Sequence, residues 1–366
     1  MPVHDELPLT EQSTPTDAQT LLHPSPHADR LAESHVPKGL NSAVITGTGF
    51  YMPEKVLTNA DLEKMVDTSD EWIIERTGIK ERRIARPEQA ASDLALEAAR
   101  RALNDAHTRP SELDLILVAT VTGDMLFPST ACLLQDRLGA PKVGAMDVSA
   151  GCTGFIYALD TARQHIATGA ARTVLVVGVE VLSRITDWTD RGTCVLLGDG
   201  SGAAVVKQSE HKHVGIVAGV LGADGSRGVD LYMPGGGSRH PATEETLRKR
   251  MHYLKMNGNA IFKVAVRSMA QTVTQLLDKI GAKPEDIKLL IPHQANLRII
   301  EAVAKQLHFS MDRVFVNIQK YANTSSATTI IALDEARKTG LIGPGDLTML
   351  VAFGAGLTWG GVAIRW

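Results

Sequence analysis

Leu113-Asp-Leu-Ile-Leu-Val-Ala119 decides the fold, because the same arrangement of elements recurs around Ile287-Lys-Leu-Leu-Ile291. Each of these apolar runs follows a helical pattern and a turn at a proline, Pro110 in one case and Pro284 in the other. Neither run alternates between apolar and polar residues in the way a half-exposed strand does, which indicates sheets covered by helices on both faces. The sequence therefore predicts an internal repeat of helix, turn and buried strand.

The repeat continues beyond each buried strand with a helix, a loop and another strand. These further strands are predicted at Val143–Val148 and Arg313–Asn317, each followed by a loop of small residues and an apolar helix. Cys152 lies 42 positions after the first proline, and Asn323 lies 39 positions after the second. The near match predicts that Cys152 and Asn323 occupy equivalent points of two similar halves, which a pseudo-twofold axis would bring to one central site.

The composition of the 366-residue chain is that of a globular protein, with 44% hydrophobic and 22% charged residues. Its 32 glycines and few aromatic residues favour an α/β core over an all-β sandwich. The net charge of −3 indicates neither a nucleic-acid nor a membrane partner, and no apolar run approaches the ~20 residues of a membrane span. Three scattered cysteines form neither a disulfide framework nor a metal site, which indicates a reducing cytoplasm.

The domain organisation is predicted as an extension at 1–40 and two halves at 41–210 and 211–366. Residues 1–40 contain six prolines and no apolar periodicity, so we expect them to be disordered. The folded part is expected to begin with a short strand from Ser42 that enters a turn at Gly47-Thr-Gly49. This turn lacks the third glycine of a dinucleotide-binding loop.

Cys152 is the candidate nucleophile, because it lies in Asp147-Val-Ser-Ala-Gly-Cys-Thr-Gly-Phe155, where a strand ends and a helix begins. A helix N-terminus offers free N–H groups and the positive end of the helix dipole, which stabilise a thiolate and lower its pKa. Cys132 and Cys194 lie in apolar runs and are expected in the core.

His293 and Asn323 are the candidate partners of Cys152. His293 directly follows the buried strand that ends at Pro292, and the carboxyl ends of strands are where α/β proteins form their sites. Asn323 precedes Thr-Ser-Ser326 and could equally be a helix N-cap. The internal repeat favours its convergence with Cys152.

Several spaced motifs resemble the β-ketoacyl-acyl-carrier-protein synthase III family of the thiolase-like superfamily. They are Asp70–Gly78, Asp147–Phe155, Pro292–Asn296, Asn323–Ser326 and Phe353-Gly-Ala-Gly-Leu-Thr-Trp-Gly360, in this order within residues 42–366. The resemblance implies a five-layered αβαβα fold with two pseudo-twofold-related halves, and a cytoplasmic homodimer. It also implies decarboxylative condensation of a short acyl-coenzyme A, such as acetyl-coenzyme A, with malonyl-acyl carrier protein, which initiates fatty acid synthesis.

In this chemistry Cys152 would carry the acyl group, and His293 and Asn323 would donate to the enolate oxygen formed by decarboxylation. Main-chain N–H groups of Cys152 and of the Phe353–Gly356 turn would hold the tetrahedral oxyanion. Ala355 stands in that turn where the family commonly has glycine. The resemblance implies no metal and no cofactor, since the coenzyme A thioester is a substrate.

The resemblance also implies binding residues. Trp72, Arg76, Arg191, Gly258 and Asn259 would bind coenzyme A, the arginines through stacking and phosphate contacts. Phe127, reaching across from a partner subunit, and Leu182 would bound the acyl pocket. A basic rim for the acidic carrier protein would consist of Lys263, Arg298 and Lys305.

Four other functions are alternatives to this one. Degradative thiolases carry a second cysteine near the C-terminus, but no cysteine follows Cys194. A cysteine hydrolase or thioesterase would use the same residue types and would release free acid. A non-catalytic binding protein is disfavoured by the intact set of Cys152, His293 and Asn323. A relative that loads polyketide starters or transfers acyl groups in secondary metabolism stays open.

Overall fold

The computed structural model describes residues 40–211 and 213–366, so the extension predicted at 1–40 lies outside the described residues except for Leu40. The strands are β1 (Ser42–Tyr51), β2 (Lys55–Thr58), β3 (Glu81–Ile84), β4 (Leu115–Ala119), β5 (Gly144–Val148), β6 (Thr173–Val181), β7 (Asp199–Ser209), β8 (Gly215–Ala223), β9 (Leu231–Tyr232), β10 (Lys255–Met256), β11 (Ile287–Pro292), β12 (Leu347–Gly354) and β13 (Thr358–Arg365). The helices are α1 (Asn59–Leu62), α2 (Asp70–Thr77), α3 (Ala91–Asp105), α4 (Thr130–Leu138), α5 (Gly154–Ala167), α6 (Arg191–Cys194), α7 (Glu244–Arg248), α8 (Gly258–Ile280), α9 (Leu297–Gln306), α10 (Ile318–Tyr321) and α11 (Thr328–Lys338).

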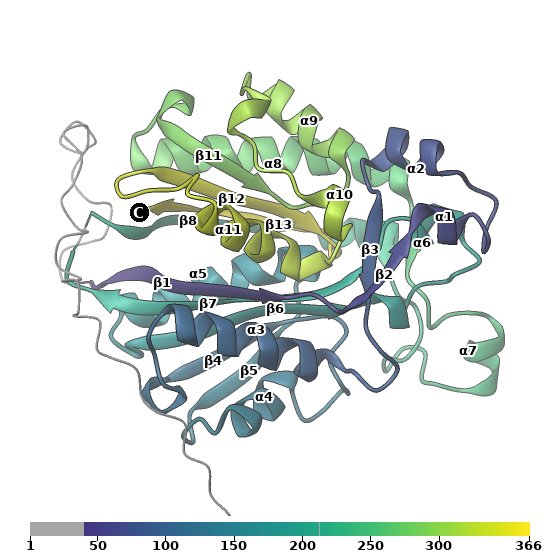
Figure 1. Ribbon diagram of the computed structural model, residues 1–366, viewed down its shortest axis with the longest axis horizontal. Helices are drawn as coiled ribbons and strands as arrows, with labels where there is room; N and C mark the ends of the chain where they lie inside the picture. The colour runs from purple at the N-terminus through teal and green to yellow at the C-terminus, as the bar shows by residue number, and fades with distance from the viewer. Residues whose placement is uncertain (1–39, 212) are drawn as a thin grey trace, which may run out of the picture.

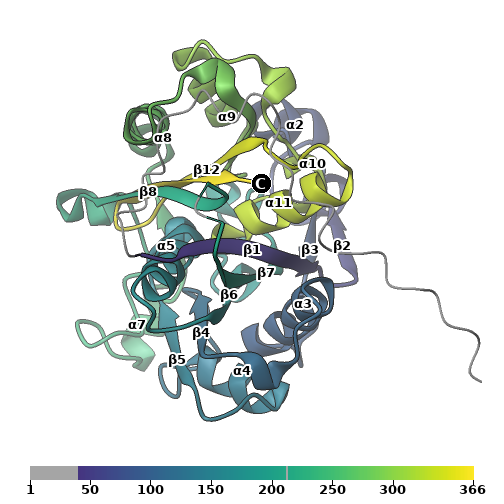
Figure 2. The same ribbon diagram turned by 90° about the vertical axis from the view of Figure 1, so that its left-hand side faces the viewer.

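Two sheets and three helical layers alternate through the molecule (Figures 1 and 2). Helices α3 and α4 cover the outer face of the sheet that contains β1, β4, β5, β6 and β7. Helices α5 and α11 lie between this sheet and the one that contains β8, β11, β12 and β13, and α8 and α9 cover the far side. The five-layered αβαβα fold is therefore confirmed.

Four strands of the five-stranded sheet have the same order as the strands of the four-stranded sheet, in which β5 has no counterpart. The order is β1-β7-β6-β4-β5 in the first and β8-β13-β12-β11 in the second, with β4 parallel to β6 and β11 parallel to β12. Strands β4, β6 and β12 are buried along their whole length, as expected for strands covered on both faces. The equivalence of the strands confirms two pseudo-twofold-related halves.

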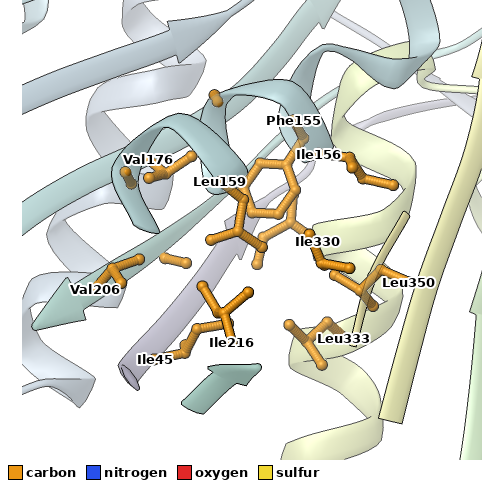
Figure 3. Close-up of a cluster of buried hydrophobic side chains, with 14 of the residues drawn as sticks. Ile45, Phe155, Ile156, Leu159, Val176, Val206, Ile216, Ile330, Leu333 and Leu350 are labelled. Carbon is orange, nitrogen blue, oxygen red and sulfur yellow. The ribbon is translucent and has the colours of Figure 1, made fainter. Parts of the chain in front are cut away.

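The layer between the sheets holds a large apolar core (Figure 3). Phe155, Ile156 and Leu159 of α5 pack there with Ile330 and Leu333 of α11, and all five side chains are fully buried. Burying an aliphatic or aromatic side chain of this size contributes about 1.5–3 kcal/mol. This core fixes the positions at which α5 and α11 begin, and both helix starts face the site described below.

Three local predictions are wrong. Gly47 and Gly49 lie inside β1 and form no turn. These positions are glycine because β1 packs closely against α3, and a Cβ at either position would lie within 2.6 Å of that segment. Residues 313–317 form no strand, and only one bridge joins Val314 to Leu290. Cys132 is exposed on α4, because the apolar run that contains it is one face of a surface helix, whereas Cys194 is buried as predicted.

The register of the internal repeat also differs from the prediction. Cys152 is the middle residue of a 3-10 helix, η3 (Gly151–Thr153), that leads into α5. Its counterpart η8 (Ser325–Ala327) leads into α11 and has Ser326 at its middle. Ser326 lies 42 positions after Pro284, the same spacing that separates Cys152 from Pro110. Ser326, and not Asn323, is therefore the equivalent of Cys152.

Candidate active site

Cys152 occupies a tight elbow between β5 and α5. Gly151 has φ +56°, a left-handed conformation that glycine adopts at little cost. Gly354, the last residue of β12, lies against the elbow so closely that a Cβ there would be 2.5 Å from the nitrogen of Cys152. The elbow thus depends on a glycine of its own and on a glycine of the other sheet.

Cys152, His293 and Asn323 line one cavity of about 130 Å³, so the structure brings the three predicted residues together. Apolar side chains of α8, including Ile261, Phe262 and Met269, line the same cavity. The sequence did not single these residues out, because their apolar spacing is that of any helix packed on a sheet. The cavity is narrow and largely apolar, which suits an acyl group next to a sulfur.

His293 directly follows the last residue of β11 and is 4% exposed. Burial lowers the pKa of its imidazole to about 3, so the ring is neutral at pH 7. Its Nδ1 lies 2.6 Å from the hydroxyl of Thr328, the first residue of α11. The ring therefore has one nitrogen engaged by the protein.

Asn323 is held by three hydrogen bonds. Its main-chain N–H donates to Leu196, its carbonyl accepts from the N–H of Gly198, and its side-chain oxygen accepts from the N–H of Ser325 at 2.8 Å. The last bond closes a turn just before η8, whose N-cap residue is Thr324, so Asn323 is not the helix N-cap considered from the sequence. This bond does not use the side-chain NH₂ group of Asn323, which leaves that group available as a donor.

The acidity of Cys152 differs from the sequence-based prediction. The pKa of the Cys152 thiol is raised to about 11, mainly by burial and to a smaller extent by the charge of Glu180. Hydrogen bonds from Ser325 and from the N–H groups of Cys152 and Ala355 act in the opposite direction, but they do not outweigh burial. At pH 7 the resting residue is a thiol beside a neutral imidazole.

Glu180 of β6 is a site residue that sequence reasoning missed. Its carboxylate is fully buried and accepts hydrogen bonds from the N–H of Val121, the hydroxyl of Thr122 and the hydroxyl of Ser325. Burial outweighs these donors, so the pKa of Glu180 lies above its usual range. The available signal was a single acid, Glu180, in the otherwise apolar strand Thr173–Val181.

Of the five residues expected to bind coenzyme A, Trp72, Arg76 and Arg191 form one cluster, whereas Gly258 and Asn259 lie apart from it. The guanidinium groups of Arg76 and Arg191 lie 5.4 and 4.9 Å from the ring centre of Trp72. Asn296, the N-cap of α9, lines the cavity and donates to the carbonyl of Arg76, which ties this cluster to the site. Of the remaining pair, Gly258 lines the cavity, whereas Asn259 is exposed and does not.

The two residues expected to bound the acyl pocket do not line the cavity of their own chain. Phe127 is 82% exposed and its neighbour Leu126 is 85% exposed, in the loop between β4 and α4. Leu182 is buried directly after β6.

The three basic residues expected to bind the carrier protein are exposed on the outer helical layer. Lys263 lies on α8, and Arg298 and Lys305 lie on α9, which packs against α8. Arg267 is also exposed, one turn after Lys263 on the same helix. Sequence reasoning missed Arg267, although its spacing from Lys263 was a readable signal. Phe262 and Ile299 line the cavity, so the two helices that carry the basic residues also contribute to the cavity wall.

Among residues 40–211 and 213–366, no helix is both long and apolar enough to cross a membrane. The same residues contain no group of three or more His, Cys, Asp or Glu side chains placed to hold a metal ion.

Comparison with known families gives two matches. The family model of 3-oxoacyl-[acyl-carrier-protein] synthase III matches residues 146–225, and the model of its C-terminal part matches residues 277–366. A β-ketoacyl-[acyl-carrier-protein] synthase III of Caldanaerobacter subterraneus is 58% identical over 325 residues, which cover 89% of this chain and 98% of the relative.

Solved structures give the same result. The crystal structure of 3-oxoacyl-[acyl-carrier-protein] synthase III from Aquifex aeolicus superposes with a TM-score of 0.83 at 52% identity, over 88% of this chain and 100% of that chain. The enzyme from Thermus thermophilus superposes with a TM-score of 0.82 at 46% identity, over 88% and 99% of the two chains.

Proposed function

Since this chain belongs to the β-ketoacyl-acyl-carrier-protein synthase III family of condensing acyltransferases, we propose that Cys152 is its nucleophile and that His293 and Asn323 complete its active site. The main support for this proposal is that all three side chains, which come from distant parts of the sequence, line one cavity at the start of α5. The reaction is the condensation of an acyl-coenzyme A with malonyl-acyl carrier protein, the first step of fatty acid synthesis.

In the loading step the Cys152 sulfur attacks the thioester carbonyl of acyl-coenzyme A. A bond from this sulfur to the acyl carbon forms, the bond to the coenzyme A sulfur breaks, and the thiol proton passes to the departing thiolate. The high pKa of Cys152 means that a base must take this proton during the attack. His293 is proposed for that role, because it lines the same cavity and its neutral ring has a nitrogen that can accept a proton; burial makes this nitrogen less basic than an exposed imidazole.

In the second step malonyl-acyl carrier protein loses carbon dioxide. The electron pair of the broken carbon–carbon bond becomes an enolate, whose oxygen is stabilised by hydrogen-bond donors. Asn323 offers its NH₂ group, and His293 offers a ring N–H. The enolate carbon attacks the acyl-Cys152 carbonyl, the carbon–sulfur bond breaks, and Cys152 leaves as a thiolate that regains a proton from solvent. The N–H groups of Cys152 and Ala355 approach the Cys152 sulfur, which supports their role as oxyanion donors.

His293 must accept a proton in the loading step and donate a hydrogen bond to the enolate oxygen in the second step. The bond between its Nδ1 and Thr328 allows both states, because the Thr328 hydroxyl has one proton and two possible acceptors. When that hydroxyl donates to the carbonyl of Ser325, Nδ1 carries the ring proton and Nε2 can accept. When the hydroxyl turns to donate to Nδ1, the ring proton is on Nε2, which can then donate.

The enzyme is proposed to be a cytoplasmic homodimer that uses a short starter such as acetyl-coenzyme A. The exposure of Leu126 and Phe127 supports a dimer, because two adjacent large apolar side chains this exposed are unusual on an isolated surface. A Phe127 ring from the partner subunit would shorten the acyl pocket. The starter, the dimer and the role of Leu182 at the pocket remain predictions.

Coenzyme A is proposed to bind at Trp72, Arg76 and Arg191, with Gly258 and Asn259 beside the pantetheine arm. The carrier protein is proposed to dock on Lys263, Arg298 and Lys305, joined by Arg267. Exposed positive charge on α8 and α9, the helices that also line the cavity, supports this assignment, because carrier proteins are acidic. The reaction as written requires no metal and no cofactor.

Mass spectrometry after exposure to acetyl-coenzyme A tests the assignment. We expect one acetyl group on Cys152, and none on Cys152→Ser. His293→Ala and Asn323→Ala should each lower carbon dioxide release from malonyl-acyl carrier protein by ~10²–10³. Acetylation of Cys132 or Cys194, or release of free acid without condensation, would contradict the proposal.

A further inference from the structure

Ser325 lies at the centre of the hydrogen bonds that surround the three proposed catalytic side chains. It is 2% exposed and opens η8 with φ +48°, in the left-handed region. Serine occupies that region only at a cost in free energy, so the surrounding structure must impose the conformation. The equivalent position of the other half is Gly151, beside Cys152, with φ +56°. A serine in place of glycine indicates that the side chain is used.

The main chain of Ser325 reaches two of the three residues. Its N–H donates to the side-chain oxygen of Asn323 at 2.8 Å. Its carbonyl accepts from the hydroxyl of Thr328 at 3.1 Å, and that hydroxyl lies 2.6 Å from Nδ1 of His293. The left-handed φ sets the direction of the carbonyl and of the side chain relative to the N–H, so this conformation allows Ser325 to contact Asn323 and Thr328 at the same time.

The side chain of Ser325 reaches the third. Its hydroxyl donates to the carboxylate of Glu180 at 3.1 Å. Helix η8 packs directly against η3, which contains Cys152, and a hydrogen bond from Ser325 lowers the pKa of the Cys152 thiol. A hydroxyl has one proton to donate. The buried Glu180 carboxylate and a Cys152 thiolate therefore compete for the same donor.

We propose that Ser325 is a positioning residue that holds Cys152, His293 and Asn323 in one arrangement, and that its hydroxyl moves between Glu180 and the Cys152 sulfur as that sulfur loses and regains its proton. In the resting thiol the hydroxyl donates to Glu180. When Cys152 becomes a thiolate, the hydroxyl turns to the sulfur, and Glu180 keeps its bonds from Val121 and Thr122. The inference rests on the proposed role of Cys152 as the nucleophile.

Few ionisable groups face Cys152, so few can give its reactivity a pH dependence. Four elements, β12, β13, η8 and α5, pack against η3. Strand β12 and η8 contain no ionisable side chain, and Arg365 is at the far end of β13. In α5 the first ionisable group is Tyr157, whose hydroxyl donates to Gly222, and the others, Asp160, Arg163 and His165, begin eight positions after Cys152. Glu180 and His293 are the remaining groups.

The side-chain contact is tested by Ser325→Ala. The rate at which iodoacetamide alkylates Cys152 is followed between pH 7 and 10, with peptide mass spectrometry separating Cys152 from the exposed Cys132. Loss of the donor should raise the thiol pKa by about one unit, which lowers the alkylation rate at pH 8 about threefold to tenfold. Ser201→Ala is the matched control, because Ser201 is also buried and donates only to the carbonyl of Gly178. It should leave the rate unchanged.

Glu180→Gln tests the competition. Removing the charge should raise the alkylation rate at pH 8, opposite to the effect of Ser325→Ala. In the double variant the gain from Glu180→Gln should be smaller, because no hydroxyl remains to be released to the sulfur. Additive effects would overturn the competition. Ser325→Gly removes the same hydroxyl and relieves the backbone strain, so its alkylation rate must fall as that of Ser325→Ala does. It replaces Ser325→Ala, alone or in the double variant, if either protein does not fold.

The main-chain contact is tested by Thr328→Val, which keeps the shape of the side chain and removes the link between Ser325 and His293. We expect carbon dioxide release from malonyl-acyl carrier protein to fall at least tenfold. Thr329→Val is the control, because Thr329 is fully buried on the same helix and its hydroxyl has no hydrogen-bond partner among the described residues. Equal rates in the two valine variants would overturn this part of the proposal.

The two proposals fail in distinguishable ways. If acetyl-coenzyme A does not acetylate Cys152 in the unsubstituted enzyme, the proposed function is wrong. If it does, but Ser325→Ala alkylates at the original rate and Thr328→Val behaves like Thr329→Val, then Ser325 has no positioning role and the proposed function stands.

Discussion

Gly354→Ala should disable the nucleophile without touching a catalytic side chain. A Cβ at Gly354 would lie 2.5 Å from the nitrogen of Cys152 and 2.9 Å from its Cβ, whereas ordinary contacts begin at 3.4 Å. The elbow or the end of β12 must therefore move by about 0.9 Å. Gly354 does not have a positive φ, so the effect comes from this contact and not from backbone strain.

A displacement of this size acts on the atoms that react. The N–H of Cys152 is a proposed oxyanion donor, and a misplacement of about 1 Å at a reacting group can lower a rate about 10²-fold. We expect the rate of acetylation of Cys152 by acetyl-coenzyme A to fall by about that factor, measured by mass spectrometry of quenched samples. Thermal unfolding of the same samples shows what fraction is folded, because overpacking itself costs about 1–3 kcal/mol.

Gly225→Ala is the control for this experiment, because a Cβ at Gly225 would meet no atom within 4 Å. It should acetylate at the original rate. If Gly354→Ala also acetylates at the original rate while folded, the close approach of β12 to the elbow does not set the position of the nucleophile, and the reasoning is refuted.

Three further predictions concern other regions. Phe127→Thr should raise activity on long acyl primers relative to acetyl-coenzyme A, and an unchanged chain-length profile would show that another residue bounds the pocket. The hydrogen bond from Arg250 holds the pKa of Asp187 below its usual range. The stability that the ionised Asp187 contributes is therefore present above about pH 4 and is lost as the pH falls further. The Tm difference between the original protein and Asp187→Asn should shrink below about pH 4, and a constant difference would contradict this. Arg82 is fully buried and donates to two carbonyls and an amide oxygen, so Arg82→Lys should lower the free energy of unfolding by about 2–4 kcal/mol in urea, whereas partly exposed Arg83→Lys should cost less than about 1 kcal/mol.

The features that the sequence predicted correctly have local signals. The elbow at Cys152 is visible because two glycines and a helix start lie within four residues of the thiol. Sheets covered by helices on both faces follow from apolar strands without alternation, whereas the five-layered order was implied by the resemblance of the spaced motifs to the family. The position of His293 follows from the end of a buried strand.

The features that the sequence did not predict depend on contacts between distant segments. Gly47 has the neighbours of a turn residue, and only the packing of α3 against it explains why it lies in a strand. The rise in the pKa of Cys152 comes from burial and from Glu180, neither of which a helix start reveals. Ser325 contacts Glu180 across 145 positions of sequence, so no spacing could have linked them. The extension at 1–40 and the domain boundaries remain predictions.

The equivalence of Cys152 and Ser326 shows that the two halves of this chain use equivalent positions for different roles. Ser326 donates to the carbonyl of Ala119 in the opposite half and reacts with nothing. Two identical subunits would have to carry every substitution twice. In a single chain the thiol can be present in one half only, while the equivalent residue of the other half, Ser326, forms a hydrogen bond that joins the two halves.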